Sequence, residues 1–442
     1  MTGAVTPTVV GVGTVPNGTH SVPERDLALT VLRDALDEAP IELGGVDGLY
    51  MPAPRPWTQQ GFFSTYLLRV LGLDVSQSLE ISTGGTSGGH AFHTAVSDIR
   101  EGRVETALVL AVERNSTIDT TGPYFEYILK SFDAEFESPI GMTVPAAYAQ
   151  SMQRYVHEHG LDRDDLAEIV VKNRKNGAGN PEGLFDDAPA RDEVLDARPV
   201  ADPIRLFDCP APCDGAAAIL LTGTEEPSPS DITVTGTGFH HEPTHFLMGP
   251  DADPTELPAV GQAVDSALDR ADNAIDDIDV FEPYAPFPHI EAMITEELGL
   301  AERGQGVDAC LAGRTAPDGE IPISPSGGCL GRGHPPMVTP LLNYIEAVRQ
   351  LRKTAATQIS DAERVLTTAE HGHLNGVTAA VFAGGSDLSS TIVSTSREVI
   401  GNPAESDLSA LSGDRRRMGR DDGLREAVFV HANPRDGGRV RR

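Results

Sequence analysis

The stretch "ISTGGTSGGHAFHTAVSDIREGRVETALVLAVE", Ile81–Glu113, decides how the chain folds. Its glycine-rich start is typical of a turn that leads into a helix, and its apolar end is typical of a buried strand. Such a turn normally presents a catalytic group at the helix start, where backbone N–H groups and the helix dipole favour negative charge. Here the tip of the turn contains only glycine, threonine and serine, so it carries no thiol.

The chain contains an internal repeat. The stretches "PTVVGVGTV" (Pro7–Val15) and "ITVTGTGF" (Ile232–Phe239) are both short apolar strands that run into glycines. Each is followed by an amphipathic helix, an acidic turn and an aromatic residue before prolines. The glycine turn of the first half is matched by "ISPSGGCLGRGHPPMVTPLLNYI" (Ile323–Ile345) in the second. We therefore predict two similar βα halves, joined near Thr222–Asp231, with the site at their junction.

The charge of the chain is extreme. It has 34 basic and 66 acidic residues, which gives a formal net charge of -32, and the acidic residues are spread along the sequence. A solvated acidic surface tolerates molar salt, where screening removes most of the self-repulsion, so we predict a halophilic protein. The same surface would repel phosphates, so we expect no nucleic-acid partner.

The sequence predicts a soluble, cytoplasmic protein with no membrane association. It has no apolar run of about 18 residues or more, and its N-terminus lacks the basic start of a signal peptide. The four cysteines are too few and too scattered for a disulfide framework. Cys209 and Cys213 form a C-x₃-C pair without a second pair, and the His371–His373 pair lacks a third ligand, so we predict no metal site.

Several motifs together resemble the thiolase superfamily, in its sterol-carrier-protein-x or lipid-transfer-protein branch. "GGTSGGHAFHTAVSDIREGRVETALVLAVE" resembles the family's nucleophile turn with its helix, and "SGGCLGRGHP" resembles its histidine loop. "YAQSMQRYVHEHGLDRDDLAEIVVKNRKNGAGNP" resembles its helical insertion. The resemblance implies an α/β thiolase fold, five-layered αβαβα, built from two pseudo-symmetric halves with mixed β-sheets. It also implies a homodimer and coenzyme A thioesters as substrates, with no tightly bound cofactor.

The repeat and the resemblance together predict how the domains are organised. We expect an N-terminal half over residues 1–225, with a helical insertion at about 120–200, and a C-terminal half over residues 226–396. Residues 397–442 contain "DRRRMGRDDGLREAVF" and end in "GGRVRR". Their low hydrophobicity and many charges predict a mobile tail.

The chain departs from the family at both of its thiols. The family's nucleophilic cysteine falls where Gly85 stands, and glycine cannot form an acyl-enzyme. The second cysteine, a proton shuttle, should fall in "LTTAEHGHLNGVTAAVF", which contains Glu370, His371 and His373 but no cysteine. We expect Glu370 or one of the histidines to replace it. Cys329 is expected to be a buried, inert thiol.

Other site residues follow from the resemblance. His334 in "GRGHP" matches the histidine that helps form an oxyanion hole for a thioester carbonyl. Tyr284 in "FEPYAPF" could donate or relay a proton to a β-oxygen, or could be a packed aromatic at a strand end. The expected substrate contacts lie in the two glycine turns: Gly85, Thr86, Ser87, Gly327, Gly328 and Gly333.

Three functions remain open from the sequence. The first is an enzyme that makes or breaks carbon–carbon bonds of acyl-CoA without a covalent intermediate, because cysteine-less members of the resembled branch act as aldolases. Those members work with a small zinc-ribbon/OB-fold partner. The second is a non-catalytic acyl-CoA-binding subunit of such a complex, and the third is a lipid-binding protein. The family label, acetyl-CoA C-acyltransferase, requires the missing thiol.

Overall fold

The strands of both halves join in one mixed sheet. We describe a computed structural model, which covers residues 5–118, 126–228, 230–243, 253–371 and 375–384. The first half contains β1 (Thr6–Thr14), α1 (Glu24–Glu38), β2 (Gly48–Pro52), α2 (Phe63–Leu71), β3 (Gln77–Ile81), α3 (Ser87–Arg100), β4 (Thr106–Glu113) and β7 (Gly215–Thr224). The second half contains β8 (Ile232–His241), α8 (Pro258–Ala271), β9 (Val280–Glu282), α9 (Pro288–Glu297), α10 (Gly306–Leu311), α11 (Gly328–Gly331), α12 (Thr339–Leu351), β10 (Arg364–His371) and β11 (Gly376–Ala383).

The strand order follows the repeat. The sheet has nine strands in the order β3-β2-β4-β7-β1-β8-β11-β10-β9, and the halves meet where β1 and β8 pair antiparallel. In the first half, β1 pairs antiparallel with β7, β7 antiparallel with β4, and β4 parallel with β2. In the second half, β8 pairs antiparallel with β11, β11 antiparallel with β10, and β10 parallel with β9. Among the described residues of the second half no full strand corresponds to β3, but Ile323 forms an isolated parallel bridge with Phe281 of β9 in the equivalent place. The sequence predicted mixed β-sheets in two pseudo-symmetric halves, and the β1–β8 pairing joins the strands of the two halves edge to edge.

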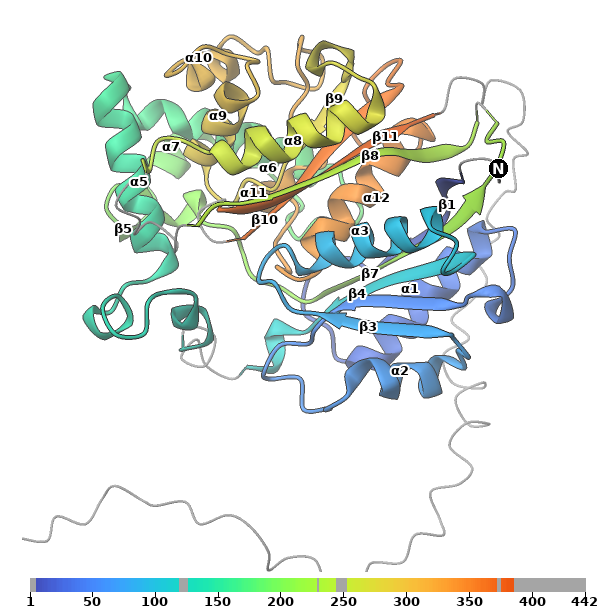
Figure 1. Ribbon diagram of the computed structural model, residues 1–442. Coiled ribbons are helices and arrows are strands. Elements are labelled where there is room, and N and C mark those ends of the chain that lie inside the picture. The colour runs from blue at the N-terminus through green and yellow to red at the C-terminus, as the bar shows by residue number, and fades with distance from the viewer. Residues whose placement is uncertain (1–4, 119–125, 229, 244–252, 372–374, 385–442) are drawn as a thin grey trace, which may run out of the picture. The chain divides into compact units, whose positions relative to one another are not determined.

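The helices complete five layers. In Figure 1, α3 and α12 lie between the two halves of the sheet, α1 and α2 cover one outer face, and α8 and α9 cover the other. One apolar cluster fills the central layer and contains side chains from both halves, such as Phe92 of α3 and Tyr344 of α12. Two further clusters lie beneath the outer helices. Because both halves share the central layer, their described residues form one compact unit.

Paired glycines explain how the outer helices lie so close to the sheet. A Cβ atom on Gly13 of β1 would lie 2.0 Å from the carbonyl oxygen of Val31 in α1. A Cβ atom on Gly238 of β8 would lie 1.9 Å from the carbonyl oxygen of Ala263 in α8. The glycines that mark the sequence repeat are therefore the positions where a helix backbone touches a strand.

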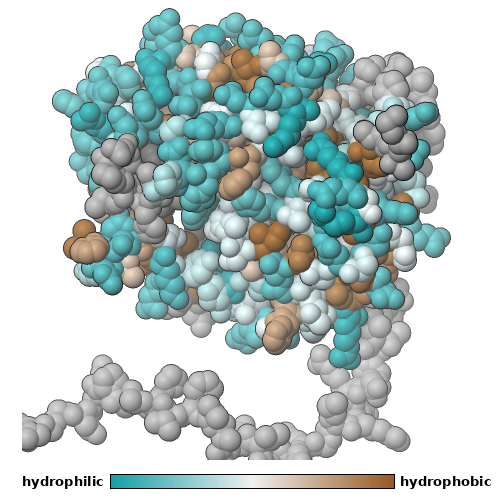
Figure 2. Space-filling view, in the orientation of Figure 1, coloured by the Kyte–Doolittle hydropathy of each residue, from teal (hydrophilic) through white to brown (hydrophobic). Residues whose placement is uncertain are grey.

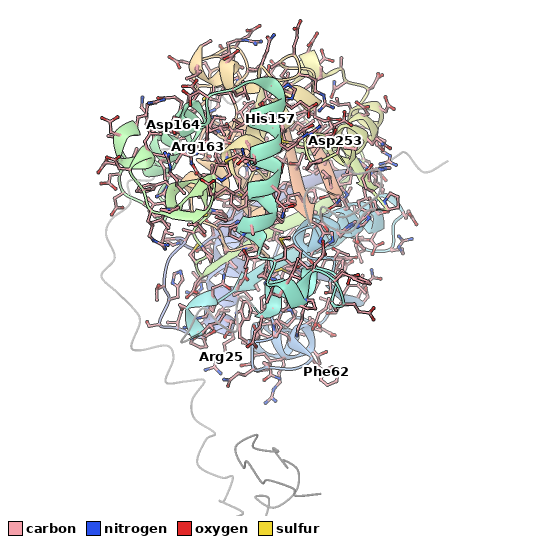
Figure 3. All side chains as sticks on the ribbon, turned by 90° about the vertical axis from the view of Figure 1, so that its left-hand side faces the viewer. Arg25, Phe62, His157, Arg163, Asp164 and Asp253 are labelled. Carbon is pink, nitrogen blue, oxygen red and sulfur yellow. The ribbon has the colours of Figure 1, made fainter. Side chains whose placement is uncertain are left out.

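A helical segment lies between β4 and β7. It contains α5 (Val144–His159), α6 (Ala167–Ala178), α7 (Arg191–Leu195) and the short strands β5 (Pro199–Ala201) and β6 (Ile204–Arg205). Figure 3 shows α5, which carries His157, running along one face of the molecule. Its buried side chains pack into the apolar core of the second half. The predicted tail, 397–442, lies outside the described residues.

Hydrophilic residues cover most of the face drawn in Figure 2. Given the net charge of -32, we expect the fold to be most stable in concentrated salt, because screening weakens repulsion between acidic side chains. The measurement is thermal unfolding between about 0.1 M and about 2 M KCl, a range over which the Debye length falls several-fold. Equal melting temperatures at both ends would contradict the halophilic prediction. No helix among the described residues is long and apolar enough to span a membrane.

Candidate active site

A cavity of about 670 Å³ opens where both halves and the helical insertion meet. The turn before α3 contributes Gly85, the loop before α12 contributes His334, and the segment after β9 contributes Tyr284. The C-terminal end of β10 contributes Glu370 and His371. The structure thus brings to one cavity residues that are up to 353 positions apart in the chain, from Gly18 to His371.

Tyr284, His334 and Thr339 form a buried hydrogen-bonded chain at the cavity wall. The Tyr284 hydroxyl lies 3.1 Å from Nε2 of His334, and Nδ1 of His334 lies 3.1 Å from the Thr339 hydroxyl. The Thr339 hydroxyl donates its own hydrogen to the carbonyl oxygen of Pro335. It must therefore accept from Nδ1, so the proton of the neutral imidazole is on Nδ1. Nε2 is then left to accept a hydrogen bond from Tyr284.

Burial keeps both rings uncharged. Burial, and to a smaller extent the nearby cations Arg55 and Arg332, lower the pKa of His334 to about 3. The pKa of Tyr284 is raised well above its usual value, first by burial and then by Cys329 and Glu370. At neutral pH, His334 is therefore a neutral acceptor and Tyr284 is a neutral donor, which fits the hydrogen bond between them.

The backbone around His334 is fixed on both sides. Its N–H donates to the carbonyl oxygen of Ala211 at 2.9 Å, and its carbonyl oxygen accepts from the N–H of Cys213 at 3.3 Å. Gly333 has a φ of +94°, a value that glycine adopts readily. This turn in the backbone comes directly before His334, which lines the cavity. The ring is therefore held in place before any substrate binds.

The glycine turn has no room for a side chain at its tip. A Cβ atom on Gly85 would lie 2.2 Å from the carbonyl oxygen of Glu370, and one on Gly84 would lie 2.3 Å from Nδ1 of His371. The Ser87 hydroxyl stabilises the turn, because it donates to the carbonyl oxygen of Gly84 and accepts from the N–H of Thr83. The backbone of the turn thus packs against the end of β10, which leaves no space for a cysteine side chain at position 85.

The cavity includes only some of the predicted substrate contacts. Gly85 lines it, whereas the described lining omits five others: Thr86, Ser87, Gly327, Gly328 and Gly333. Thr86 and Ser87 are buried and bonded within their own turn. At Gly327 a Cβ atom would lie 2.6 Å from the backbone of α6, so that glycine serves helix packing. His373 lies outside the described residues.

Arg55 is a site residue that the sequence analysis missed. It lines the cavity although only 7% of it is exposed, and its Nε donates to Glu113 at 2.9 Å. Glu113 also accepts from the N–H of Met337, three residues after His334. Arg55 follows the C-terminal end of β2, a parallel strand, and this is the end where α/β folds place their sites. That position was the signal that could have identified it.

Tyr148 was also missed, because it lies on α5 in the helical insertion. Its ring packs on Phe287 at a centroid distance of 4.3 Å, and both line the cavity. Its pKa is raised by burial and by the charges of Glu370 and Cys329. No local pattern in the sequence distinguishes this tyrosine from a core residue of the helix.

The cysteines of the cavity are poor nucleophiles. Cys209 and Cys213 line it, and burial raises the pKa of each to about 12. Both are therefore thiols at neutral pH. Cys329 is 1% exposed and lies outside the described lining, as expected for a buried thiol. Among the described residues, no group of three His, Cys, Asp or Glu side chains could hold a metal ion.

Comparisons with known proteins identify the family to which this fold belongs. The thiolase N-terminal domain matches residues 5–225, and the thiolase C-terminal domain-like family matches residues 241–384. The chain belongs to the thiolase superfamily, in the branch that includes sterol-carrier-protein thiolases and aldolases. This confirms the resemblance and the fold class predicted from the sequence.

Relatives include both thiolases and lyases. The acetyl-CoA acetyltransferase of Methanothermobacter thermautotrophicus is 30% identical over 353 residues, which are 78% of this chain and 90% of that protein. The 17-hydroxy-3-oxo-4-pregnene-20-carboxyl-CoA lyase of Mycobacterium tuberculosis is 29% identical over 288 residues, 62% of this chain and 69% of that protein. The solved Ltp2–ChsH2(DUF35) aldolase is similar in fold, with a TM-score of 0.74 at 23% identity, covering 87% of this chain and 99% of that one.

Proposed function

We propose that the protein cleaves or forms a carbon–carbon bond of a β-hydroxyacyl-CoA thioester by aldol chemistry, without an acyl-cysteine intermediate. The observation that carries this proposal is the Tyr284–His334–Thr339 chain, which faces a turn with no room for a nucleophile. The relative named as a carboxyl-CoA lyase supports it, because a lyase breaks a bond without acyl transfer.

In the cleavage direction, the substrate β-hydroxyl gives its proton to the Tyr284 oxygen while Tyr284 passes its own proton to Nε2 of His334. The bond between the α- and β-carbons breaks, the β-carbon becomes a carbonyl, and the electron pair forms the enolate of the shorter acyl-CoA. The backbone of the glycine turn at Gly85, which lines the cavity, stabilises the enolate oxygen. The α-carbon then takes a proton from the side of the cavity that contains Glu370 and His371. The proton on His334 returns to water as the carbonyl product leaves.

In this proposal His334 accepts a proton, whereas the sequence suggested that it donates a hydrogen bond to the thioester oxygen. The difference rests on Thr339. Its hydroxyl donates to the carbonyl oxygen of Pro335, so it accepts a hydrogen bond from the protonated Nδ1 of the imidazole and leaves Nε2 as the acceptor. The lowered pKa of His334 does not prevent proton transfer in this proposal, because the enolate that forms beside it is negatively charged and stabilises the imidazolium.

Two kinds of protein partner belong to the proposal. A small zinc-ribbon/OB-fold protein is supported by the fold neighbour, which is an aldolase with a DUF35 partner. A homodimer is supported by β3, which is an edge strand of the sheet and carries Leu79 with 36% of its surface exposed. Edge strands present backbone groups that a second chain can pair with.

The alternative is a non-catalytic acyl-CoA-binding subunit, which is favoured by the loss of a nucleophile at Gly85. The test is to incubate the protein, alone and with its partner, with 3-hydroxybutyryl-CoA and to follow acetaldehyde and acetyl-CoA. We expect cleavage while the intact mass of the protein stays unchanged, because Cys209 and Cys213 are protonated. A Cys209→Ser/Cys213→Ser variant, the control, should be equally active.

Two outcomes would count against the proposed function. A stable acyl adduct on any cysteine, Cys329 included, would reassign the nucleophile and favour thiolase chemistry. Binding of the thioester without cleavage, with the partner present, would leave the binding-subunit function.

A further inference from the structure

Two histidines on strands that are not neighbours lie beside each other at the edge of the cavity. His241 ends β8 and His371 ends β10, and β11 lies between these strands in the sheet. The first residue of β11, Gly376, is in register with both histidines. The two imidazoles are stacked, with ring centroids 5.8 Å apart and planes inclined by 29°.

Glycine at position 376 is what allows this contact. A Cβ atom on Gly376 would lie 2.7 Å from Cδ2 of His241, so any other residue would displace that ring. Gly84 leaves space for the ring of His371 in the same way, because a Cβ atom at position 84 would lie 2.3 Å from Nδ1 of His371. His371 thus lies between the glycine turn of the cavity and the ring of His241.

The two rings lie in different environments. His371 lines the cavity, next to Glu370, whereas His241 is exposed to solvent. Nδ1 of His241 lies 2.8 Å from the carbonyl oxygen of Glu242, which accepts its hydrogen, so Nε2 of the neutral ring holds a lone pair. A proton relay needs one imidazole that exchanges protons with water and a second imidazole that reaches the reacting atoms. His241 has the first position and His371 has the second.

We propose that His241 and His371 carry protons between bulk water and the cavity, and that His371 delivers the proton taken by the α-carbon of the enolate. This proposal rests on the aldol function above. Nε2 of His241 takes a proton from solvent and passes one across a bridging water to His371. His371 then protonates the carbon and returns to its neutral form. One proton enters by this route for each one that leaves His334, so the cycle balances.

The test compares His241→Gln with the matched control His240→Gln. His240 precedes it on β8, so its side chain points to the other face of the strand, and its Nε2 lies 3.5 Å from Glu242. In weakly buffered solution we expect His241→Gln to lower kcat by about tenfold or more with KM unchanged, a loss on the scale of acid–base catalysis. Added imidazole should restore kcat, and His240→Gln should behave like the wild type.

A second measurement follows the relay without cleavage. Wild-type protein in D₂O should place deuterium on the methyl carbon of acetyl-CoA, and His241→Gln should do so more slowly. An unchanged kcat in His241→Gln, or a loss that imidazole does not restore, would overturn the relay while the aldol function stands. A wild type that exchanges deuterium but cleaves no 3-hydroxybutyryl-CoA would overturn the proposed function and leave the relay. A wild type that does neither would overturn both.

Discussion

Tyr284→Phe is expected to lower kcat/KM for cleavage of 3-hydroxybutyryl-CoA by about 10³-fold, within the range for loss of a general acid–base group. The variant keeps the ring that packs against His334 but removes the hydroxyl that lies 3.1 Å from Nε2. Without that oxygen, the β-hydroxyl proton has no path to His334. Steady-state kinetics measures the loss, and calorimetry should find an unchanged affinity for coenzyme A, since the group acts only in the transition state.

Tyr344→Phe is the matched control for this variant. Tyr344 is as fully buried as Tyr284, but it lies in the central layer and outside the described lining of the cavity. It should keep its activity. His334→Ala should lose at least about 10²-fold, because it removes the acceptor at the end of the same path. Activity of Tyr284→Phe close to that of the wild type would remove Tyr284 from the mechanism and leave it as a packed aromatic.

Gly85→Cys is expected to destabilise the protein rather than to restore thiolase chemistry. The added Cβ atom would meet the carbonyl oxygen of Glu370 at 2.2 Å, and a backbone atom at the end of a buried strand cannot move away as a flexible side chain can. Overpacking of this kind costs about 1–3 kcal/mol, occasionally more. Thermal unfolding should show a lower melting temperature, and intact mass after exposure to acetyl-CoA should show no adduct.

Gly18→Cys provides the matched control for the second variant. Gly18 also lines the cavity, but a Cβ atom at that position meets nothing within 4 Å. This variant adds a thiol to the same cavity without a clash, and its melting temperature should stay close to that of the wild type. A Gly85→Cys protein that is as stable as the wild type and carries an acetyl group would contradict our account of the turn.

The sequence predicted the fold because the features that decide it are local and repeated. The glycines at Gly13 and Gly238, the amphipathic helices after them and the turn near Gly85 can each be recognised within a few residues. Once two halves of the same pattern were recognised, the layered arrangement and the meeting of His334 with the glycine turn followed. Tyr284 and Glu370 were named from the family resemblance, because each lies in a segment that matches one of the family's motifs.

The tertiary structure alone decided where each residue of the site lies and what surrounds it. Whether a glycine lines the cavity, as Gly85 does, or serves helix packing, as Gly327 does, depends on which distant backbone lies against it. The contact of His241 with His371 depends on a third strand between them, and no spacing along the chain encodes it. Local sequence determines turns and periodic faces, because these depend on neighbouring residues. Burial, proton position and access to the cavity depend on segments that only folding brings together.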